Sequence, residues 1–446
     1  MPSLANPFTL QKQFLFTSAF TCLVLCATLA VILSSFWAFA PLFIAALFYS
    51  ILRWPVQLIA AILFLVPFLP LPLQGLKALG FSWGESASAV KELGLLAAGC
   101  VLAFRHGLKL EKSDLVLLGL FVWALVVTLI HPTSSAPSGL KDDFDFVIPY
   151  IVGRLISLRP GWIKTGLWVA GFVAILGLIE FFFAGIGTRM LLMGVQDIAE
   201  LTPTFKADFF EGFRAGSTLG GPLEFGGFCA VALLVFGSFY RDLPKKYLVF
   251  ALLIASGLIV SLTRMAGLAL LLGLLFIAIR TGQKLRLATI TLGLTALTLG
   301  VLLPRMGLQE FFKASLSGED SSLGSHRTSL EEKSVYVLSH PIGTGAGTVG
   351  PRALVRDPNA LQAESAFLQF GLEYGWLGIL LFTGFCGWIC FRLRKVGSNF
   401  GIAACAVAIA MFTMYFFSAI HMEFGLCSWA WVTIGFGIQQ RGHSLA

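Results

Sequence analysis

Two arginines draw attention because they lie beside long apolar stretches that contain few other charges. Arg264 occurs in SLTRMAGLALL, and Arg214 occurs in EGFRAGSTLGGPLEF, just before an apolar segment. An arginine that joins two membrane helices can simply extend its side chain to the water interface, and Arg214 by itself is only a loop arginine. A guanidinium group forms bidentate contacts with phosphate oxygens, however, so two converging arginines would suit a diphosphate.

Acid–base chemistry has candidates in the second half of the chain. Glu364 precedes an aromatic-rich apolar segment, where the dipole of a following helix would favour its ionised form. His340 lies beside a glycine-rich run, and an unperturbed histidine pKa of about 6.5 suits a general base. His326 lies in the same polar region. For each histidine alone, a solvated loop position is the simpler interpretation.

Three further features allow both a structural and a functional interpretation. Glu224 and Glu373 lie in apolar segments, where a carboxylate costs several kcal/mol and faces the protein interior or a cavity. A structural hydrogen bond or ion pair explains them as well as a functional role does. The run SHPIGTGAGTVG could present backbone N–H groups to a phosphate, or it could form a plain turn.

The composition determines the class of protein. Of the 446 residues, 57% are hydrophobic and only 12% are charged, which is too little polar cover for a soluble domain. Apolar runs of about 17–25 residues recur along the whole chain, and this is the length that crosses a bilayer as a helix. We therefore expect one all-α polytopic membrane domain covering residues 1–446. The eight cysteines show no zinc or redox spacing, and we expect neither a metal nor a cofactor.

The apolar runs predict about 12–14 transmembrane helices. The weakest candidate is residues 146–158, which is short and contains Arg154. The candidate spans are residues 14–34, 37–52, 56–73, 89–104, 115–130, 146–158, 166–183, 223–240, 247–262, 265–279, 287–303, 365–390, 400–420 and 424–438.

Basic residues predict the orientation of these spans. Five connections are basic, and lysine and arginine collect in cytoplasmic loops, which also explains the net charge of +8 without a nucleic-acid partner. Successive connections between spans must lie on alternate sides of the membrane. If all five basic connections are cytoplasmic, this alternation holds only when residues 146–158 cross or re-enter the membrane. Both termini are then cytoplasmic. The connections contain Arg105, Lys109 and Lys112; Arg159 and Lys164; Arg241, Lys245 and Lys246; Arg280, Lys284 and Arg286; and Arg392, Arg394 and Lys395.

This orientation leaves two long exoplasmic loops. One covers residues 186–221, and the larger one covers residues 305–364, between the eleventh and twelfth predicted spans. The larger loop should contain short helices. Thr328 and Glu331 have the spacing of a capping box, which predicts a helix that starts near Thr328 and stops at Pro341.

Four motifs in the same order resemble the Wzy-like superfamily of O-antigen polymerases and O-antigen ligases. RAGSTLGGPLEFGGF is similar to the arginine loop and Pro-led helix of that family, and SLTRMAGLALL is similar to its Ser-x-Arg helix junction. SHPIGTGAGTVG resembles its Pro-x-Gly-x-Gly turn, and ESAFLQFGLEYGWLGILLF resembles its re-entry helix. The resemblance covers residues 214–382.

The resemblance implies metal-independent glycosyl transfer on the periplasmic face of the bacterial inner membrane. The donor would be a glycan on undecaprenyl diphosphate, and the acceptor would be another lipid-linked glycan or a lipid core. Arg214 and Arg264 would bind the donor diphosphate, while a carboxylate or histidine would deprotonate the acceptor hydroxyl. Other polysaccharide-assembly proteins are expected partners besides the lipid bilayer.

Departures from the family pattern distinguish the two activities. The ligase pattern begins its re-entry helix with His-Asn, whereas this chain has Glu364-Ser365, and it has Pro222-Leu223-Glu224 where family members often show Pro-Asn. The first difference favours a polymerase of lipid-linked repeats, with a ligase as the alternative. It also favours Glu364 as the base, because the flanking motif defines its place, with His340 as the rival.

Two other classes of function compete with the transferase interpretation. A solute or ion transporter should have ionisable residues in the middle of its spans and an internal repeat, whereas the charges here gather at one face and no repeat is visible. A non-catalytic scaffold of a polysaccharide-assembly complex is the third interpretation.

Overall fold

The computed structural model describes residues 40–70, 84–108, 110–184, 214–282, 321–357 and 360–443. These ranges are helical, with no β-strand among them and one isolated bridge between Val349 and Leu361. The predicted all-α architecture is therefore confirmed. The predicted spans at residues 14–34 and 287–303, and the loop residues 186–213 and 305–320, lie outside the described residues.

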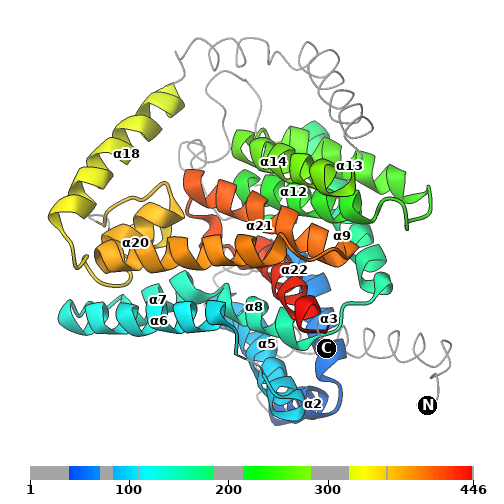
Figure 1. The fold of residues 1–446 in the computed structure, drawn as a ribbon, viewed down its shortest axis with the longest axis horizontal. Coiled ribbons are helices and arrows are strands. Elements are labelled where there is room, and N and C mark those ends of the chain that lie inside the picture. Colours follow the sequence, from blue (N-terminus) through cyan, green and yellow to red (C-terminus); the bar gives the residue numbers. More distant parts are fainter. Residues whose placement is uncertain are drawn as a thin grey trace.

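The helices form a bundle from which one helix, α18, extends (Figure 1). In chain order the α-helices are α2 (Ala40–Arg53), α3 (Pro55–Leu65), α5 (Gly84–His106), α6 (Lys112–Ile130), α7 (Ala136–Phe144), α8 (Val147–Leu155), α9 (Pro160–Ile179), α12 (Pro222–Phe239), α13 (Tyr247–Val260), α14 (Arg264–Thr281), α18 (Ser321–Ser339), α19 (Pro351–Arg356), α20 (Ala366–Leu393), α21 (Asn399–Phe417) and α22 (Phe424–His443).

Six helices in the described ranges are long and apolar enough to cross a membrane, namely α6, α9 with its continuation to Phe183, α12, α14, α20 and α21. A seventh span is possible if the pair Ala46–Arg53 and Pro55–Phe68, which is bent by 114°, forms one crossing. The chain is thus a multi-pass membrane protein. The finer number of 12–14 crossings stays a prediction.

Helices α12 and α21 form the interior of the bundle. In each, 67% of the apolar window is buried, compared with 28% in α6, which lies at the periphery. α21 can occupy the centre because it is rich in alanine, and small residues let helices approach closely. A Cβ atom placed on Gly437 of α22 would lie 2.3 Å from the Cβ of Ala404, which shows how near the two helices come.

The basic connections gather at one end of the bundle, which we call the basic end. The contacts that join them there are Arg392 with Glu111 (2.6 Å), Arg280 with the carbonyl of Val396 (3.4 Å), Asn399 with Asp242 (2.7 Å) and Arg154 with Asp114. Ser398 also contacts Gln440 (3.1 Å), so the last described turn of the chain lies at this end. The grouping is the one that the predicted orientation requires.

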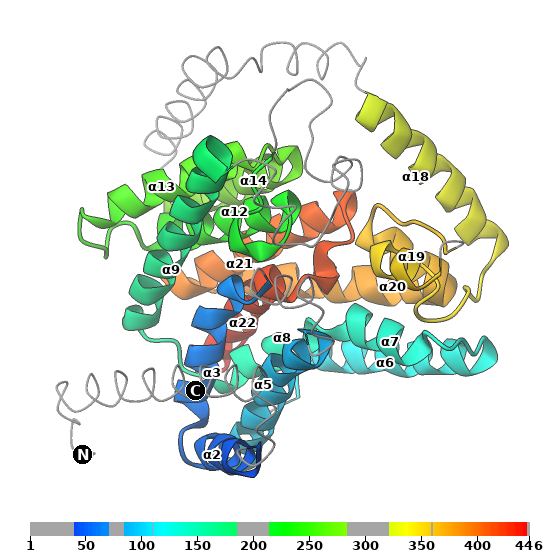
Figure 2. The same ribbon diagram turned by 180° about the vertical axis from the view of Figure 1, so that it is seen from behind.

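Two short helices replace the predicted span at residues 146–158. α8 has nine residues and a length of about 14 Å, which is too short to cross a bilayer. Together α7 and α8 run back along α6 (Figures 1 and 2): Ser135 bonds the carbonyl of Gly347 near one end of α6, and Arg154 pairs with Asp114 at the other. Residues 146–158 therefore contain no helix long enough to cross a membrane by itself, and the expectation that they cross or re-enter the membrane stays a prediction.

Candidate functional site

The end of the bundle opposite the basic end, which we call the site end, contains the sequence-predicted residues. Three contacts between elements define it: Thr263 Oγ1 donates to the carbonyl of Pro222 (2.9 Å), Ser365 Oγ donates to the carbonyl of Tyr415 (3.2 Å), and Arg352 donates to the carbonyl of Met422 (2.6 Å). A Cβ atom on Gly425 of α22 would also lie 2.8 Å from Leu219, just before α12, so the starts of α12, α14 and α22 lie together, with the start of α20 beside the end of α21.

Helix α20 is broken at Gly375, within the segment that resembles a re-entry helix. Gly375 has φ +66° and ψ −161°, a conformation that favours glycine, and the break interrupts the helical hydrogen bonds on both sides. The glycine-rich turn after α18 supplies the missing partners. The N–H groups of Thr344 and Gly345 donate to the carbonyls of Leu372 and Glu373 (2.9 Å each).

The same turn also binds the carboxylate of Glu373. This side chain is fully buried, and it accepts hydrogen bonds from the N–H groups of Val349 (3.0 Å) and Gly347. The N–H groups of the glycine-rich run thus donate to oxygens of α20, and these bonds take the place of contacts with a phosphate. The structural interpretation holds for both the run and Glu373.

A second buried carboxylate, Asp143 of α7, joins three parts of the site end. It accepts hydrogen bonds from the Tyr374 hydroxyl and from Gln369 Nε2 (2.8 Å), and it lies 3.4 Å from His421 Nε2. Burial would raise the pKa of Asp143, but hydrogen bonds from Glu373, His421 and Tyr374 outweigh burial and lower that pKa. Asp143 therefore connects α7, the first half of α20 and the link before α22.

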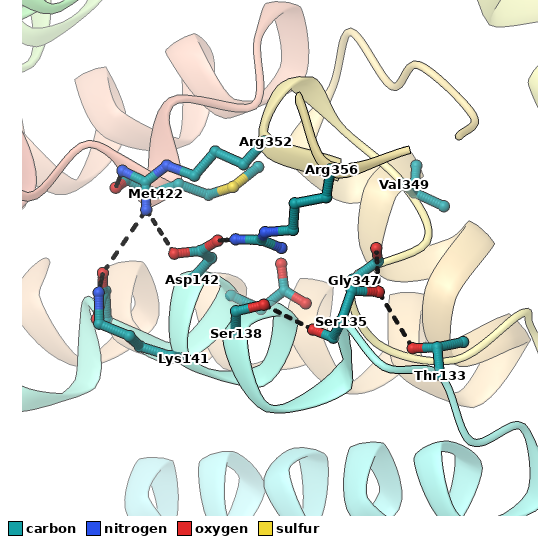
Figure 3. A network of polar contacts seen from close by, with 12 residues as sticks. Thr133, Ser135, Ser138, Lys141, Asp142, Gly347, Val349, Arg352, Arg356 and Met422 are labelled. Carbon is teal, nitrogen blue, oxygen red and sulfur yellow. Dashed lines mark hydrogen bonds and ion pairs between the residues drawn. The ribbon is translucent and has the colours of Figure 1, made fainter. Parts of the chain in front are cut away.

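Its neighbour Asp142 has other partners and holds two arginines of α19 (Figure 3). Asp142 pairs with Arg352 (2.6 Å) and with Arg356. Burial alone would lower the pKa of Arg352, but the charges of Glu423 and Asp142 outweigh it and raise that pKa. This arginine pair is thus matched by carboxylates of the protein itself.

Sequence reasoning missed this network. The signal was the acidic run DDFD at residues 142–145, which lies beside the predicted exoplasmic face, together with Arg352 and Arg356 after the glycine-rich turn. Because the partners are about 210 residues apart, no spacing rule joins them.

A third acidic residue of the run, Asp145, lies near both positively and negatively charged side chains. Lys141 is 3.7 Å away and Arg352 is 4.0 Å away, while Lys141 also pairs with Glu92 (3.0 Å). Burial and the negative charge of Glu92 raise the pKa of Asp145 to about 7, although Lys141 and Arg352 oppose them. This carboxyl group is therefore partly protonated at neutral pH.

The structure brings Arg214 to the turn that precedes Arg264. Arg214 Nε donates to the carbonyl of Ser261 (3.2 Å), and its Nη2 donates to Thr263 Oγ1 (3.3 Å). α14 begins at Arg264, the next residue, which is exposed. We call this arrangement of Arg214, Arg264 and the turn between α13 and α14 the arginine junction.

The electrostatics of the arginine junction differ from those of the α19 pair. The two hydrogen bonds of Arg214 go to neutral oxygens. Burial and the positive charge of Arg264 lower the pKa of Arg214 to about 10, and the carboxylate of Glu224, in the first turn of α12, only partly offsets them. A bound anion at the junction would relieve this repulsion.

The two candidate bases occupy different surroundings. Glu364 is half-buried and directly precedes Ser365, the N-cap of α20, whose bond to Tyr415 places this helix start beside the end of α21. His340 is exposed; its ring stacks on Tyr336, and its Nδ1 contacts Ser339 Oγ (3.0 Å). The side-chain contacts described for His340 thus all lie within the last turns of α18, and they do not join it to the arginine junction.

Within the described ranges, no three or more His, Cys, Asp or Glu side chains are grouped so that they could hold a metal ion. Comparison of the chain with protein-family models and with curated proteins gives no match.

Proposed function

We propose that this chain is a metal-independent membrane glycosyltransferase that polymerises oligosaccharide repeats linked to undecaprenyl diphosphate. It would act on the periplasmic face of the bacterial inner membrane, with both termini cytoplasmic. The observation that carries the proposal is the arginine junction. Two neighbouring guanidinium groups, one of them desolvated and donating to neutral oxygens within the described part of the chain, form a site that suits a diphosphate.

The reaction follows from the chemistry of a glycosyl diphosphate. The acceptor hydroxyl oxygen attacks the anomeric carbon of the donor, and the bond between this carbon and the diphosphate oxygen breaks. The lipid diphosphate leaves with the bonding electrons, and the hydroxyl proton passes to a base. Arg214 and Arg264 would stabilise the charge that develops on the leaving diphosphate.

For the base we propose Glu364, with His340 as the alternative. Glu364 is supported by its place at the start of α20, which Ser365 ties to the end of α21 within the site end. The side chain is half-buried, so a carboxylate there is less strongly hydrated than one in a loop. His340 instead lies on the exposed end of α18.

The orientation is supported by the distribution of charge. The basic connections and the last described turn of α22 lie at the basic end, and the positive-inside rule would make that end cytoplasmic. The arginine junction would then face the periplasm, together with the described part of the loop at residues 305–364.

The main test replaces the gene in its host with single variants and compares polymer length on gels with the amount of protein in the membrane. Arg214→Ala and Arg264→Ala should abolish elongation at normal protein levels. Arg241→Ala, an exposed arginine at the basic end, is the matched control and should leave elongation unchanged. Normal polymer from both junction variants would overturn the proposal. Normal repeat length with loss of transfer to a lipid core would indicate the ligase.

The base is tested in the same strain. Glu364→Gln should reduce elongation by on the order of 100-fold or more, because general base catalysis contributes about that much. His340→Asn should leave most of the activity. The opposite result, a nearly normal Glu364→Gln variant and an inactive His340→Asn variant, would transfer the role to His340.

A further inference from the structure

The second half of α18 carries an exposed apolar stripe. Val335 and Leu338 are each 65% exposed, and Ile342, just after the helix, is 44% exposed. Val335 and Leu338 are three residues apart and lie on one side of the last turns of α18, and Ile342 lies in the turn that follows the helix. The opposite face is occupied, because Val337 is buried in a small cluster with Val349 and Leu372. The exposed stripe is therefore not needed to attach α18 to the protein.

This stripe continues into the exposed face of a membrane-spanning helix. Trp376, Leu377 and Leu380 of α20 are exposed by 47%, 42% and 68%, and α20 is one of the six apolar spans. An exposed apolar face on such a span faces lipid. The stripe and this face meet at the break in α20.

Two hydrogen bonds join the two surfaces. Trp376 donates through Nε1 to the carbonyl of Val337 (2.9 Å) and through its backbone N–H to the carbonyl of Pro341 (3.0 Å). A Cβ atom on Gly375 would lie 2.6 Å from the carbonyl carbon of Ile342, so Ile342 lies directly against the break. Exposed apolar residues of α20 and of the end of α18 therefore lie next to each other at this contact.

The residues around the stripe indicate how deep it lies. Tryptophan favours the boundary between hydrocarbon and head groups, which fits Trp376 at the junction of the two surfaces. Glu331 and Glu332 lie one to two turns farther from α20, where they are exposed, and they would not enter hydrocarbon. Figures 1 and 2 show α18 leaving the end of α20 obliquely, away from the bundle.

We propose that the second half of α18 is seated in the interfacial layer of the lipid bilayer, with Val335, Leu338 and Ile342 in contact with lipid. The occupant of this surface is the bilayer itself, because the stripe continues a lipid-facing surface and ends in exposed polar residues. The last turns of α18 would then form an interfacial segment attached to a span at Trp376. The inference does not depend on the proposed enzymatic activity.

The test places a spin label on single introduced cysteines in the full-length chain in liposomes, with the unmodified chain as the blank for native cysteines. Accessibility is measured to oxygen, which concentrates in lipid, and to a water-soluble nickel chelate. Labels at Val335→Cys and Leu338→Cys should be severalfold more accessible to oxygen, relative to nickel, than labels at Thr328→Cys and Glu332→Cys, which lie farther from the break in α20. All four positions are exposed and belong to one helix, so the comparison is internal to α18.

Two outcomes would overturn the inference. Equal nickel accessibility at all four positions would place the helix in water. Exclusion of both reagents from positions 335 and 338, together with crosslinking between chains through these cysteines, would make the stripe a contact between two copies of the protein. Trp376→Ala provides a second measurement: the label at position 338 should become more accessible to nickel if Trp376 holds α18 at the membrane.

Discussion

The site end contains two arginine pairs that lie in different electrostatic surroundings. Arg352 and Arg356 share the carboxylate of Asp142, and nearby negative charges raise the pKa of Arg352. Arg214 bonds neutral oxygens beside Arg264, and its pKa is lowered to about 10. The first pair is balanced by the fold, so its role is to hold α19 on α7. The second pair gains from an added anion, which is why we assign it to the substrate.

The largest effect expected from this comparison concerns Asp142. Asp142→Ala removes the carboxylate that both α19 arginines share and leaves Arg352 with its longer contacts to Glu423 (3.7 Å) and Asp145 (4.0 Å). Breaking a buried pair costs about 3–5 kcal/mol, but both arginine side chains are about one third exposed, so the free energy of unfolding should fall by about 2–4 kcal/mol. Thermal unfolding in detergent measures it, with Glu332→Ala, at an exposed position, as the control.

Thermal unfolding also tests whether the two arginine pairs really differ. Arg214→Ala should leave thermal stability nearly unchanged, because the variant removes a desolvated cation that lies beside another one. If Arg214→Ala destabilises the protein as much as Asp142→Ala, the arginine junction is structural and the proposed diphosphate site loses its support.

A smaller effect separates charge from geometry. Lysine retains the positive charge but not the planar fork, so Arg264→Lys should reduce polymer formation by roughly 10- to 100-fold while the stability stays normal. Arg352→Lys should do the reverse and lower the stability, since its bonds to Asp142 and to the carbonyl of Met422 use two ends of the guanidinium. Both are compared as polymer on gels and as melting temperature. Equal loss of polymer from the two variants, at normal stability, would place Arg352 in the site as well.

The sequence predicted those parts of the structure that depend on local pattern. Apolar runs gave α20, α21 and α22 to within a few residues, and lysines and arginines correctly marked the connections that meet at one end. The helix before Pro341 was also predicted, but it begins at Ser321 rather than near Thr328. Helix ends at a proline are easier to predict, because the ring blocks the helical hydrogen bond.

The parts that could not be predicted depend on contacts between distant segments. The carboxylate of Glu373 could have faced a substrate, and the N–H groups of the glycine-rich run could have bound a phosphate. Only the fold shows that the two features bind each other. Val349, which donates to the Glu373 side chain, is 24 residues away from it in the sequence. Asp143 needed partners from α20 and from the link before α22, more than 200 residues away. By contrast, the convergence of Arg214 and Arg264 was expected from their two helix boundaries, and their role stays a prediction.

The smallest expected effect concerns Asp145 and tests whether its carboxyl group is ionised, as that of Asp142 is in its ion pairs. Asp145 lies beside Lys141 and Arg352, yet burial and the charge of Glu92 raise its pKa to about 7. An unfolded aspartate has a pKa of about 3.9, so the folded state binds this proton more tightly. Between pH 4 and 7 the contribution of Asp145 to stability therefore falls as the pH rises, and above pH 7 the loss is complete. The two pKa values differ by an amount equivalent to about 4 kcal/mol, which local rearrangement will reduce.

Asp145→Asn cannot ionise and should escape this loss. The variant and the unmodified protein should have similar stability at pH 4, whereas the variant should be more stable at pH 8 by roughly 1–3 kcal/mol. Thermal unfolding at both pH values in one detergent measures the difference, with Glu332→Gln, at an exposed position, as the control. If Asp145→Asn is instead the less stable protein at pH 8, then Lys141 and Arg352 keep the carboxylate ionised. Asp145 would in that case act as Asp142 does, as a second anion that balances the α19 arginines, and the contrast with the arginine junction would become sharper.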